Sequence, residues 1–295
     1  MNVWFDSHQE QVDQYFTTRA VEWKELYEAS TLQGRIYQDR RGIALRWIDG
    51  LNLACDARVL EVGCGAGVTT AALAHRGYQI DALDSVPEML DLTRRAVGEV
   101  SVEHRVRALT GDVHDLQFQD EVYDLAIALG VLPWLHSPQQ ALRELTRVLR
   151  PEGFLLFTAD NAWRLSHVLD PRTTPVLAAT RKCVARTLRA LGVMRTMFRP
   201  GLVRMDSLKD VDASVQAVGL KLCRTATVGF GPMCFWGRPL LSDHVGIKLH
   251  LKLQSLADHN WPILRRSGSQ YVVLASKSAQ RGGRSADSEN GIAHF

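Results

Sequence analysis

The chain has 295 residues, of which 46% are hydrophobic, so it can build one large core or a core with a modest cap. Its net charge of +3 is too small to indicate nucleic acid as a partner. The sequence has neither a run of about 18 apolar residues nor the start of a signal peptide, and we expect a cytoplasmic protein. Its five cysteines show no C-x-x-C spacing and no close histidine partners, so neither a metal site nor a disulfide framework is expected.

Two or three helices are expected before the first strand. Aromatic residues recur near helical spacing at Tyr15, Phe16, Trp23 and Tyr27, and an arginine-rich helical pattern covers residues 35–48. The aromatic side chains either pack this segment onto the core or enclose a ligand. The sequence leaves both interpretations open.

A strand and a glycine-rich turn follow in residues 58–67, RVLEVGCGAG. The strand ends in Glu61, and glycines occupy alternate positions at Gly63, Gly65 and Gly67. Dinucleotide folds carry G-x-G-x-x-G, whose last glycine lets a helix N-terminus approach a pyrophosphate. Here the sixth position is Val68, so the turn suits a ligand without a pyrophosphate better.

Two aspartates lie at the ends of the next two expected strands. Asp84 ends the strand at 77–84, where a carboxylate can accept both hydroxyls of a ribose, and Asp112 follows the strand at 106–109. Either aspartate alone would be explained as a helix N-cap or a solvated loop acid. Their order, each at the C-terminal end of a strand, favours a ligand site.

The remaining core elements also fit an α/β fold. Residues 123–129 are nearly all apolar, as in a central parallel strand covered on both faces. A helix is expected at 138–149, a Pro-Glu-Gly break at 151–153 and a strand at 154–159. Two further strands are expected at 220–230 and 270–277.

These motifs resemble the class I S-adenosylmethionine (SAM) methyltransferases, strongly over about residues 55–160 and weakly outside them. The glycine turn is similar to their motif I, G-D-V at 111–113 to their adenine-binding segment, and R-V-L-R-P-x-G-x-L is typical of their core. The resemblance implies a SAM-dependent enzyme. Its fold would be a Rossmann-like seven-stranded, mostly parallel sheet flanked by helices, with an N-terminal helical lid and a helical cap insertion.

The same resemblance implies roles for individual residues. Glu61 would face the ammonium group of SAM, Asp84 would bind the ribose, and Asp112 the adenine amine. The N-terminal segment is similar to the lid of the ubiquinone and magnesium-protoporphyrin biosynthesis methyltransferases, in which Tyr15 would cover the sulfonium and Arg41 would reach the cofactor carboxylate. The expected cofactor-binding residues are Tyr15, Arg41, Glu61, Gly63, Cys64, Gly65, Gly67, Asp84, Ser85, Met89, Asp112, Val113 and Leu129.

The segment between Asn161 and Asp206 is longer than the fold requires, so we expect a substrate cap. Residues 176–197 place Arg181, Lys182, Arg186 and Arg189 on one helical face and Leu177, Val184, Leu188 and Leu191 on another. This helix could pack on the protein's own core with a solvated basic face, cover an anionic or lipid-like substrate, or rest on an anionic membrane. The expected substrate-binding residues are Tyr27, Trp134, Asn161, Trp163 and Phe235.

The sequence thus predicts methyl transfer from SAM to a hydrophobic small-molecule intermediate, at oxygen. Trp134 stands where the magnesium-protoporphyrin enzymes carry a histidine, so His136 is the candidate base. Tyr15, over the sulfonium, is the second expected catalytic residue. A membrane-surface methyltransferase of a lipid or quinone and a non-catalytic SAM-binding scaffold are the alternatives. No oligomeric state is indicated.

The expected organisation has five parts. They are an N-terminal lid at 1–50, a SAM-binding core at 51–160, a cap at 161–206, the C-terminal part of the sheet at 207–278, and a disordered tail at 279–295.

Overall fold

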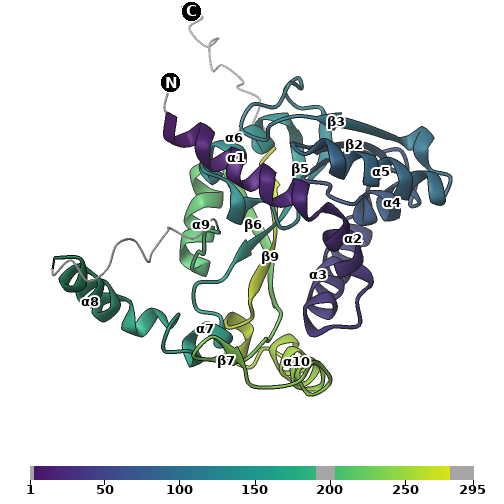
Figure 1. Cartoon of the computed structure of the whole chain (residues 1–295). Coiled ribbons are helices and arrows are strands. Elements are labelled where there is room, and N and C mark those ends of the chain that lie inside the picture. The colour runs from purple at the N-terminus through teal and green to yellow at the C-terminus, as the bar shows by residue number, and fades with distance from the viewer. Residues whose placement is uncertain (1–2, 191–202, 280–295) are drawn as a thin grey trace, which may run out of the picture.

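The computed structural model describes residues 3–190 and 203–279 and contains a seven-stranded sheet in the order β3-β2-β1-β4-β5-β9-β6 (Figure 1). β9 is antiparallel to both of its neighbours, and the other strand pairs of this sheet are parallel. The expected mostly parallel seven-stranded fold is therefore confirmed. The strands are β1 (Arg58–Val62), β2 (Gln79–Asp84), β3 (Val106–Thr110), β4 (Tyr123–Ala128), β5 (Leu149–Asp160), β6 (Leu220–Val228) and β9 (Gln270–Lys277).

Helices cover both faces of the sheet. One apolar core joins the sheet to α3 (Leu32–Asp49), α4 (Val68–Ala74) and α5 (Pro87–Glu99). A second core joins the opposite face to α6 (Pro138–Val148) and α9 (Leu208–Ala217). The central strand β4 contributes Leu125 and Ile127 to the first core and Ala126 and Ala128 to the second, which explains its continuous apolar sequence.

The start of β5 differs from the expected helix break. Helix α6 ends at Val148, and Pro151, Glu152 and Gly153 lie inside β5 instead of in a turn. The pairing register of β4 with β5 shifts between Tyr123 and Leu125, and Glu152 has a φ of 64°. Residues 151–153 are therefore accommodated as a bulge-like irregularity near the start of β5.

Three helices precede the sheet, α1 (Val3–Thr18), α2 (Ala20–Glu28) and α3. The cap segment forms α7 (Leu165–Leu169), the short η3 (Pro175–Leu177) and α8 (Ala178–Ala190). A paired turn, β7 (Cys234–Phe235) and β8 (Arg238–Pro239), leads into α10 (Asp243–Asp258) and the short η4 (Leu264–Arg266), which the sequence analysis did not anticipate. The short η1 (Glu103–Arg105) and η2 (Leu132–Trp134) complete the described elements.

No helix in the described ranges is long and apolar enough to cross a membrane. The expected disordered tail lies outside the described residues, except for residue 279.

Candidate functional site

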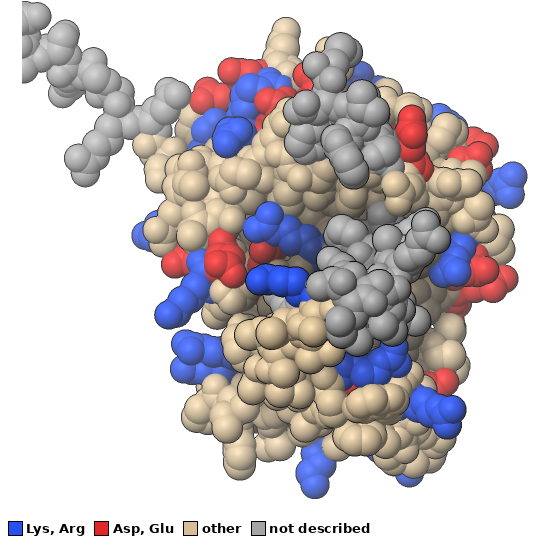
Figure 2. All heavy atoms as spheres, turned by 60° about the vertical axis from the view of Figure 1, so that its left-hand side comes forward, with Lys and Arg blue, Asp and Glu red and all other residues tan. Residues whose placement is uncertain are grey.

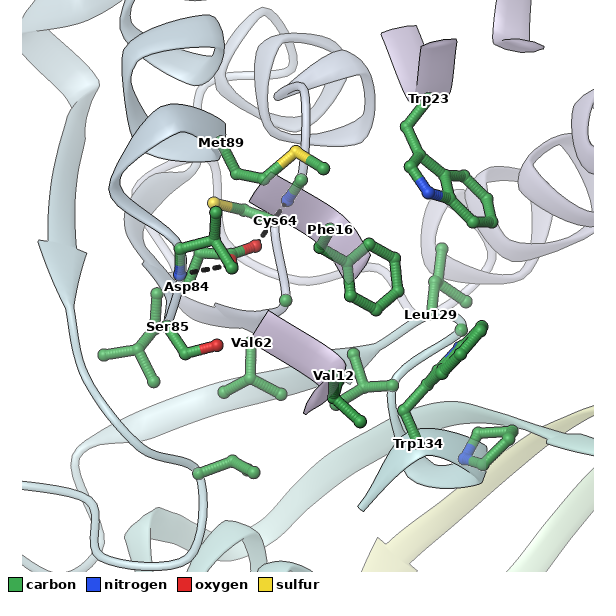
Figure 3. A pocket seen from close by; sticks show the side chains of 18 of the residues that line it. Val12, Phe16, Trp23, Val62, Cys64, Asp84, Ser85, Met89, Leu129 and Trp134 are labelled. Carbon is green, nitrogen blue, oxygen red and sulfur yellow. Dashed lines mark hydrogen bonds between the residues drawn. The ribbon is translucent and has the colours of Figure 1, made fainter. Parts of the chain in front are cut away.

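A cavity opens at the C-terminal ends of β1, β2 and β4 and is covered by the N-terminal helices (Figure 3). Carboxyl ends of parallel strands meet at one edge of a sheet, where ligands of such folds bind. Nine of the expected cofactor-binding residues line this cavity: Gly63, Cys64, Gly65, Asp84, Ser85, Met89, Asp112, Val113 and Leu129.

The glycine turn needs its glycines for two different reasons. Gly65 has a φ of 55°, and a Cβ there would meet no atom within 4 Å, so this residue leaves room for a ligand. Gly67 has a φ of 75°, and a Cβ there would lie 2.6 Å from the Cα of Thr93 on α5. Gly67 does not line the cavity and instead allows α4 and α5 to approach the turn closely.

Cys64 is a buried wall residue of the cavity. Burial raises the pKa of its thiol well above the ordinary cysteine value, and the hydroxyl of Thr93 lies 3.4 Å from its sulfur. A thiol in this state is a poor nucleophile, so Cys64 fills space in the wall.

Asp84 is fixed by the turn that it faces. Its two carboxylate oxygens accept hydrogen bonds from the backbone N–H groups of Gly65 at 2.9 Å and Val86 at 3.0 Å, drawn as dashed lines in Figure 3. Burial raises the pKa of this carboxyl above the usual aspartate value, although these two N–H groups oppose the shift. Each oxygen has a further lone pair for a ligand hydroxyl.

Asp112 is oriented by a pair of histidines. One carboxylate oxygen accepts hydrogen bonds from the backbone N–H of His114 at 2.9 Å and from its ring at 2.7 Å. The hydrogen bond from the His114 side chain lowers the pKa of Asp112 below its usual value. The ring of His136 stacks on that of His114 with 3.9 Å between centroids.

The structure therefore does not bring His136 into the cavity wall, and no histidine of the described residues lines the cavity. The expectation that His136 acts as the base has no geometric support in this arrangement. Its position in sequence, two residues after Trp134, carried no information on which way its ring points.

Glu61 lies behind the glycine turn instead of in the cavity wall. It is 3% exposed and accepts a hydrogen bond from the Thr70 hydroxyl at 2.6 Å. Burial raises the pKa of Glu61 to about 7, with Arg41 acting in the opposite direction.

The N-terminal helices present Phe16 and Trp23 to the cavity, where Figure 3 shows both rings on the side of Leu129 and Trp134. Tyr15 instead stacks on Trp134, with 5.2 Å between ring centroids and 25° between ring planes, and does not line the cavity. Neighbouring residues on a helix point about 100° apart. Of the two adjacent aromatics, Phe16 is thus the one that faces a ligand.

Of two adjacent arginines, the one that was not predicted lines the cavity. Arg41 donates a hydrogen bond to the carbonyl oxygen of Val68 at 2.9 Å and lies outside the cavity wall. Arg40 lines the cavity, is 3% exposed, and donates to the Tyr27 hydroxyl at 2.7 Å and to Gln270 at 3.4 Å. Its buried Nε has no hydrogen-bond partner among the described residues, and the described part of the chain offers it no ion pair.

The structure brings Tyr27 and Trp134 of the expected substrate-binding residues into the cavity wall, but not the other three. The side chain of Asn161 is fully buried and donates to the carbonyl oxygens of Arg266 and Gly268, both at 2.8 Å. Its amide oxygen accepts from the backbone N–H of Trp163 at 2.8 Å. Asn161 therefore anchors loops, while Trp163 and Phe235 are about half exposed outside the cavity.

A second cavity adjoins the first and shares Tyr37, Asp160 and Gln270 with it. Gln270 donates a hydrogen bond to Asp160 at 2.8 Å, and the Arg164 guanidinium lies 3.6 Å from the other Asp160 oxygen. Burial raises the pKa of Asp160 above its usual range. These residues were not predicted from the sequence, although Asp160 ends a strand at the same sheet edge as Asp84.

The remaining predicted features of the cap are only partly described. Arg181 donates to the carbonyl oxygens of Pro171 and Thr174, at 3.3 and 2.7 Å, and so holds the preceding turn. Leu177 and Val184 are exposed, so this part of the apolar stripe does not pack on the protein core. The side chains of Lys182, Leu188, Arg189 and Leu191 lie outside the described set. No cluster of three metal-ligating side chains occurs in the described part of the chain.

Comparison with known proteins adds family evidence to this geometry. The methyltransferase domain family matches residues 60–157. An uncharacterized methyltransferase of Mycobacterium tuberculosis is 36% identical over 108 residues, which are 37% of this chain and 42% of that protein. A malonyl-[acyl-carrier protein] O-methyltransferase of Enterobacter lignolyticus is 31% identical over 173 residues, 54% of this chain and 65% of that protein.

The solved structure of magnesium protoporphyrin IX methyltransferase from Synechocystis, with bound SAH, superposes with a TM-score of 0.60 at 15% identity. The match covers 92% of this chain and all of that chain, and shows a common fold. The chain spans less than half the length of the mycobacterial relatives that it matches. Residues 60–157 therefore match the methyltransferase domain family, and the sheet built around them has the fold seen in the SAH-bound methyltransferase.

Proposed function

We propose that this protein transfers the methyl group of SAM to an oxygen atom of a hydrophobic small molecule. The observation that carries the proposal is one cavity with two unlike walls. One wall holds the glycine turn, Asp84 and Asp112, and the other holds Phe16, Trp23 and further aromatic rings. The first suits a nucleoside and the second a largely apolar acceptor.

Within this proposal, the cofactor lies along the strand ends. Asp84 accepts the ribose hydroxyls and Asp112 the adenine amine, while Val113 and Met89 enclose the ring. Arg40, instead of Arg41, binds the carboxylate of the methionine part, because its buried guanidinium lines the cavity, whereas Arg41 lies outside the cavity wall. Phe16 supplies the aromatic face near the sulfonium, a contact that contributes about 1–2 kcal/mol when water is excluded.

Methyl transfer is an in-line displacement that neutralises the positive sulfur, so alignment and exclusion of water are the main tasks of the protein. An acceptor carboxylate is already ionised and needs no base. For an acceptor hydroxyl, Asp160 is the proposed proton acceptor, because it lies where the two cavities meet and burial raises its pKa.

Oxygen as the acceptor atom is favoured by two sets of relatives. Besides the malonyl-[acyl-carrier protein] enzymes, a ubiquinone biosynthesis O-methyltransferase of Aeromonas salmonicida is 29% identical over 104 residues. The aromatic wall of the cavity is consistent with an acceptor of low polarity.

The experiment has two stages. Calorimetry with SAM and SAH, with NADH as the control ligand, tests the cofactor. Labelled SAM is then incubated with the protein and separate panels of carboxylic acids, phenols and amines, and the products are treated with alkali. A methyl ester releases labelled methanol, whereas an ether or a methylamine does not. SAM binding without transfer to any panel, even in a single turnover, would favour a non-catalytic SAM-binding scaffold.

A further inference from the structure

Exposed apolar side chains gather at the end of the molecule farthest from the N-terminal half of α1. Of the large hydrophobic residues that are exposed in the described ranges, all but Val21 and Val100 fall between Trp163 and Ile263. The most prominent are Leu169, Val176, Trp236, Leu240, Trp261 and Ile263, of which Trp236 is 64% and Ile263 75% exposed. These residues lie in or next to α7, η3, the β7–β8 turn, α10 and η4, and in Figure 1 α7, β7 and α10 lie together at the lower end. We call this surface the apolar end.

The apolar end is held together as one unit. A small core joins α7, the loop between β6 and β7, α10 and η4 through Leu165, Phe230, Met233, Leu253 and Leu264. Asp170 accepts a hydrogen bond from the backbone N–H of Gly237 at 2.8 Å, and Arg172 donates to the carbonyl oxygen of Trp236 at 3.1 Å. The exposed rings are therefore presented on a fixed support.

The turn between β7 and β8 projects Trp236 from this support. Phe235 pairs with Arg238 across the turn, and the two residues between them, Trp236 and Gly237, have φ values of 53° and 78°. Both central residues of a type I′ turn require positive φ, for which Asn-Gly is the favoured pair. A tryptophan is disfavoured at the first of these two positions, so turn formation does not explain why it is present there.

The charge of the apolar end is strongly positive. The segments 163–186 and 231–266 contain ten lysines and arginines but three aspartates, and the whole range 163–266 contains no glutamate. Figure 2 shows the corresponding lower half of the visible face as tan with scattered blue and little red, whereas red is frequent in the upper half. Lys248 and Lys252 lie one turn apart on the exposed side of α10, beside Val245 and Leu251.

We propose that the apolar end docks on an anionic lipid bilayer, with Trp236, Trp261 and Ile263 in the headgroup region and the surrounding lysines and arginines against the lipid charges. Tryptophan is favoured at this depth because one ring combines an apolar body with an N–H donor. Apolar side chains mixed with basic ones match a surface that is apolar below and negative above. A second copy of this chain would carry the same positive charge and would be repelled.

Docking here would also bring the acceptor to the methyl-transfer site, an inference that rests on the proposed function. The second cavity is lined by Asp170, Cys234 and Gly237 of the apolar end and shares Asp160 and Gln270 with the cofactor cavity. An amphiphilic acceptor held in a bilayer is therefore the substrate class that this arrangement fits.

The test is co-sedimentation of the full chain with phosphatidylcholine vesicles, with and without phosphatidylglycerol, at low and high salt. We expect binding only to the anionic vesicles and loss of binding at high salt. The pair K248E and K252E should weaken binding at least about fivefold for each residue, since a basic side chain near such a surface contributes about 1 kcal/mol. Trp236→Asn should also weaken binding, while its Asn-Gly turn keeps the fold.

Two control variants carry changes of the same kind, each at one position away from the apolar end. Val21→Ser removes an exposed apolar group from α2, and R143E reverses an exposed charge on α6. Neither should change vesicle binding. Absence of sedimentation with anionic vesicles, or equal losses in the controls, would overturn the docking proposal, as would a salt-sensitive complex with an acidic protein but not with vesicles. SAM binding measured in parallel is independent of all these outcomes, so failure here leaves the methyltransferase proposal standing.

Discussion

Replacing Asp84 tests cofactor recognition, and folding must be followed at the same time because this carboxylate serves both. Its oxygens hold the N–H groups of Gly65 and Val86 and, in the proposed complex, accept the ribose hydroxyls as well. Asp84→Ala removes every one of these acceptors. Asp84→Asn retains one acceptor oxygen but replaces the other by a donor.

The expected magnitude follows from the burial of the site. A hydrogen bond to a charged group contributes about 1.5–3 kcal/mol, and each 1.4 kcal/mol corresponds to a factor of about ten in Kd. With Asp84 only 9% exposed, solvent cannot replace the lost acceptor. Losing one such bond to the ribose should raise the Kd for SAM by about 10- to 150-fold in Asp84→Ala, with a smaller increase in Asp84→Asn.

Calorimetry with SAM and SAH measures this effect. The unfolding temperature of each variant must be determined first, because Asp84→Ala also leaves two backbone N–H groups without an acceptor, and the titration is then run below that temperature. Asp91→Ala is the matched control, since that aspartate lies on the exposed side of α5 in an ion pair with Arg94. Exposed ion pairs of this kind contribute about 0–1 kcal/mol to the free energy of unfolding, so the control should stay folded. An unchanged Kd for SAM in a folded Asp84→Ala protein would refute the assignment of the ribose site.

Three further perturbations test other parts of the site. Arg40→Met should raise the Kd for SAM at least about tenfold and Arg41→Met clearly less, as measured by calorimetry, since only Arg40 lines the cavity. Deletion of residues 1–30 should leave a folded core that binds SAM weakly and transfers no methyl group, and full turnover would show that these helices only pack. Burial raises the pKa of Glu61 to about 7, so the folded state binds a proton that the unfolded chain has released; stability should be greatest below the ordinary glutamate pKa and fall as the pH rises toward 7. Chemical denaturation between pH 5 and about 8 should show this fall, and Glu61→Gln should lack it.

The fold could be predicted from the sequence because its main signals are periodic and local. The apolar run of β4 and the stripe of α6 result from burial on one or both faces, which recurs at fixed spacing. The bulged start of β5 and the whole of α10 were missed. In both cases tertiary packing decides: β5 pairs with β4 across an irregular register, and α10 is buried only along the row formed by Gly246, His250, Gln254 and Ala257.

The glycine turn and the strand-end carboxylates could be placed along one cavity for a similar reason, because their positions are fixed by the backbone. The lid and the acceptor side could not. Sequence placed an aromatic pair and an arginine pair in the lid, but the orientation of a helix about its axis decides which member faces the ligand. That orientation depends on contacts such as Tyr15 with Trp134 and Arg41 with Val68, which join segments far apart in the chain.

The acidic groups around the cavity also suggest why SAM and SAH should be handled differently. Burial raises the pKa values of Glu61, Asp84 and Asp160, so each gains when a positive group comes close. SAM carries a sulfonium and an ammonium, whereas SAH keeps only the ammonium. The transfer therefore removes one favourable charge from a poorly solvated site at the moment when the product must leave. Arg40 has the opposite sign and faces the carboxylate that both cofactor forms share in our proposal, so it would anchor either form without distinguishing them.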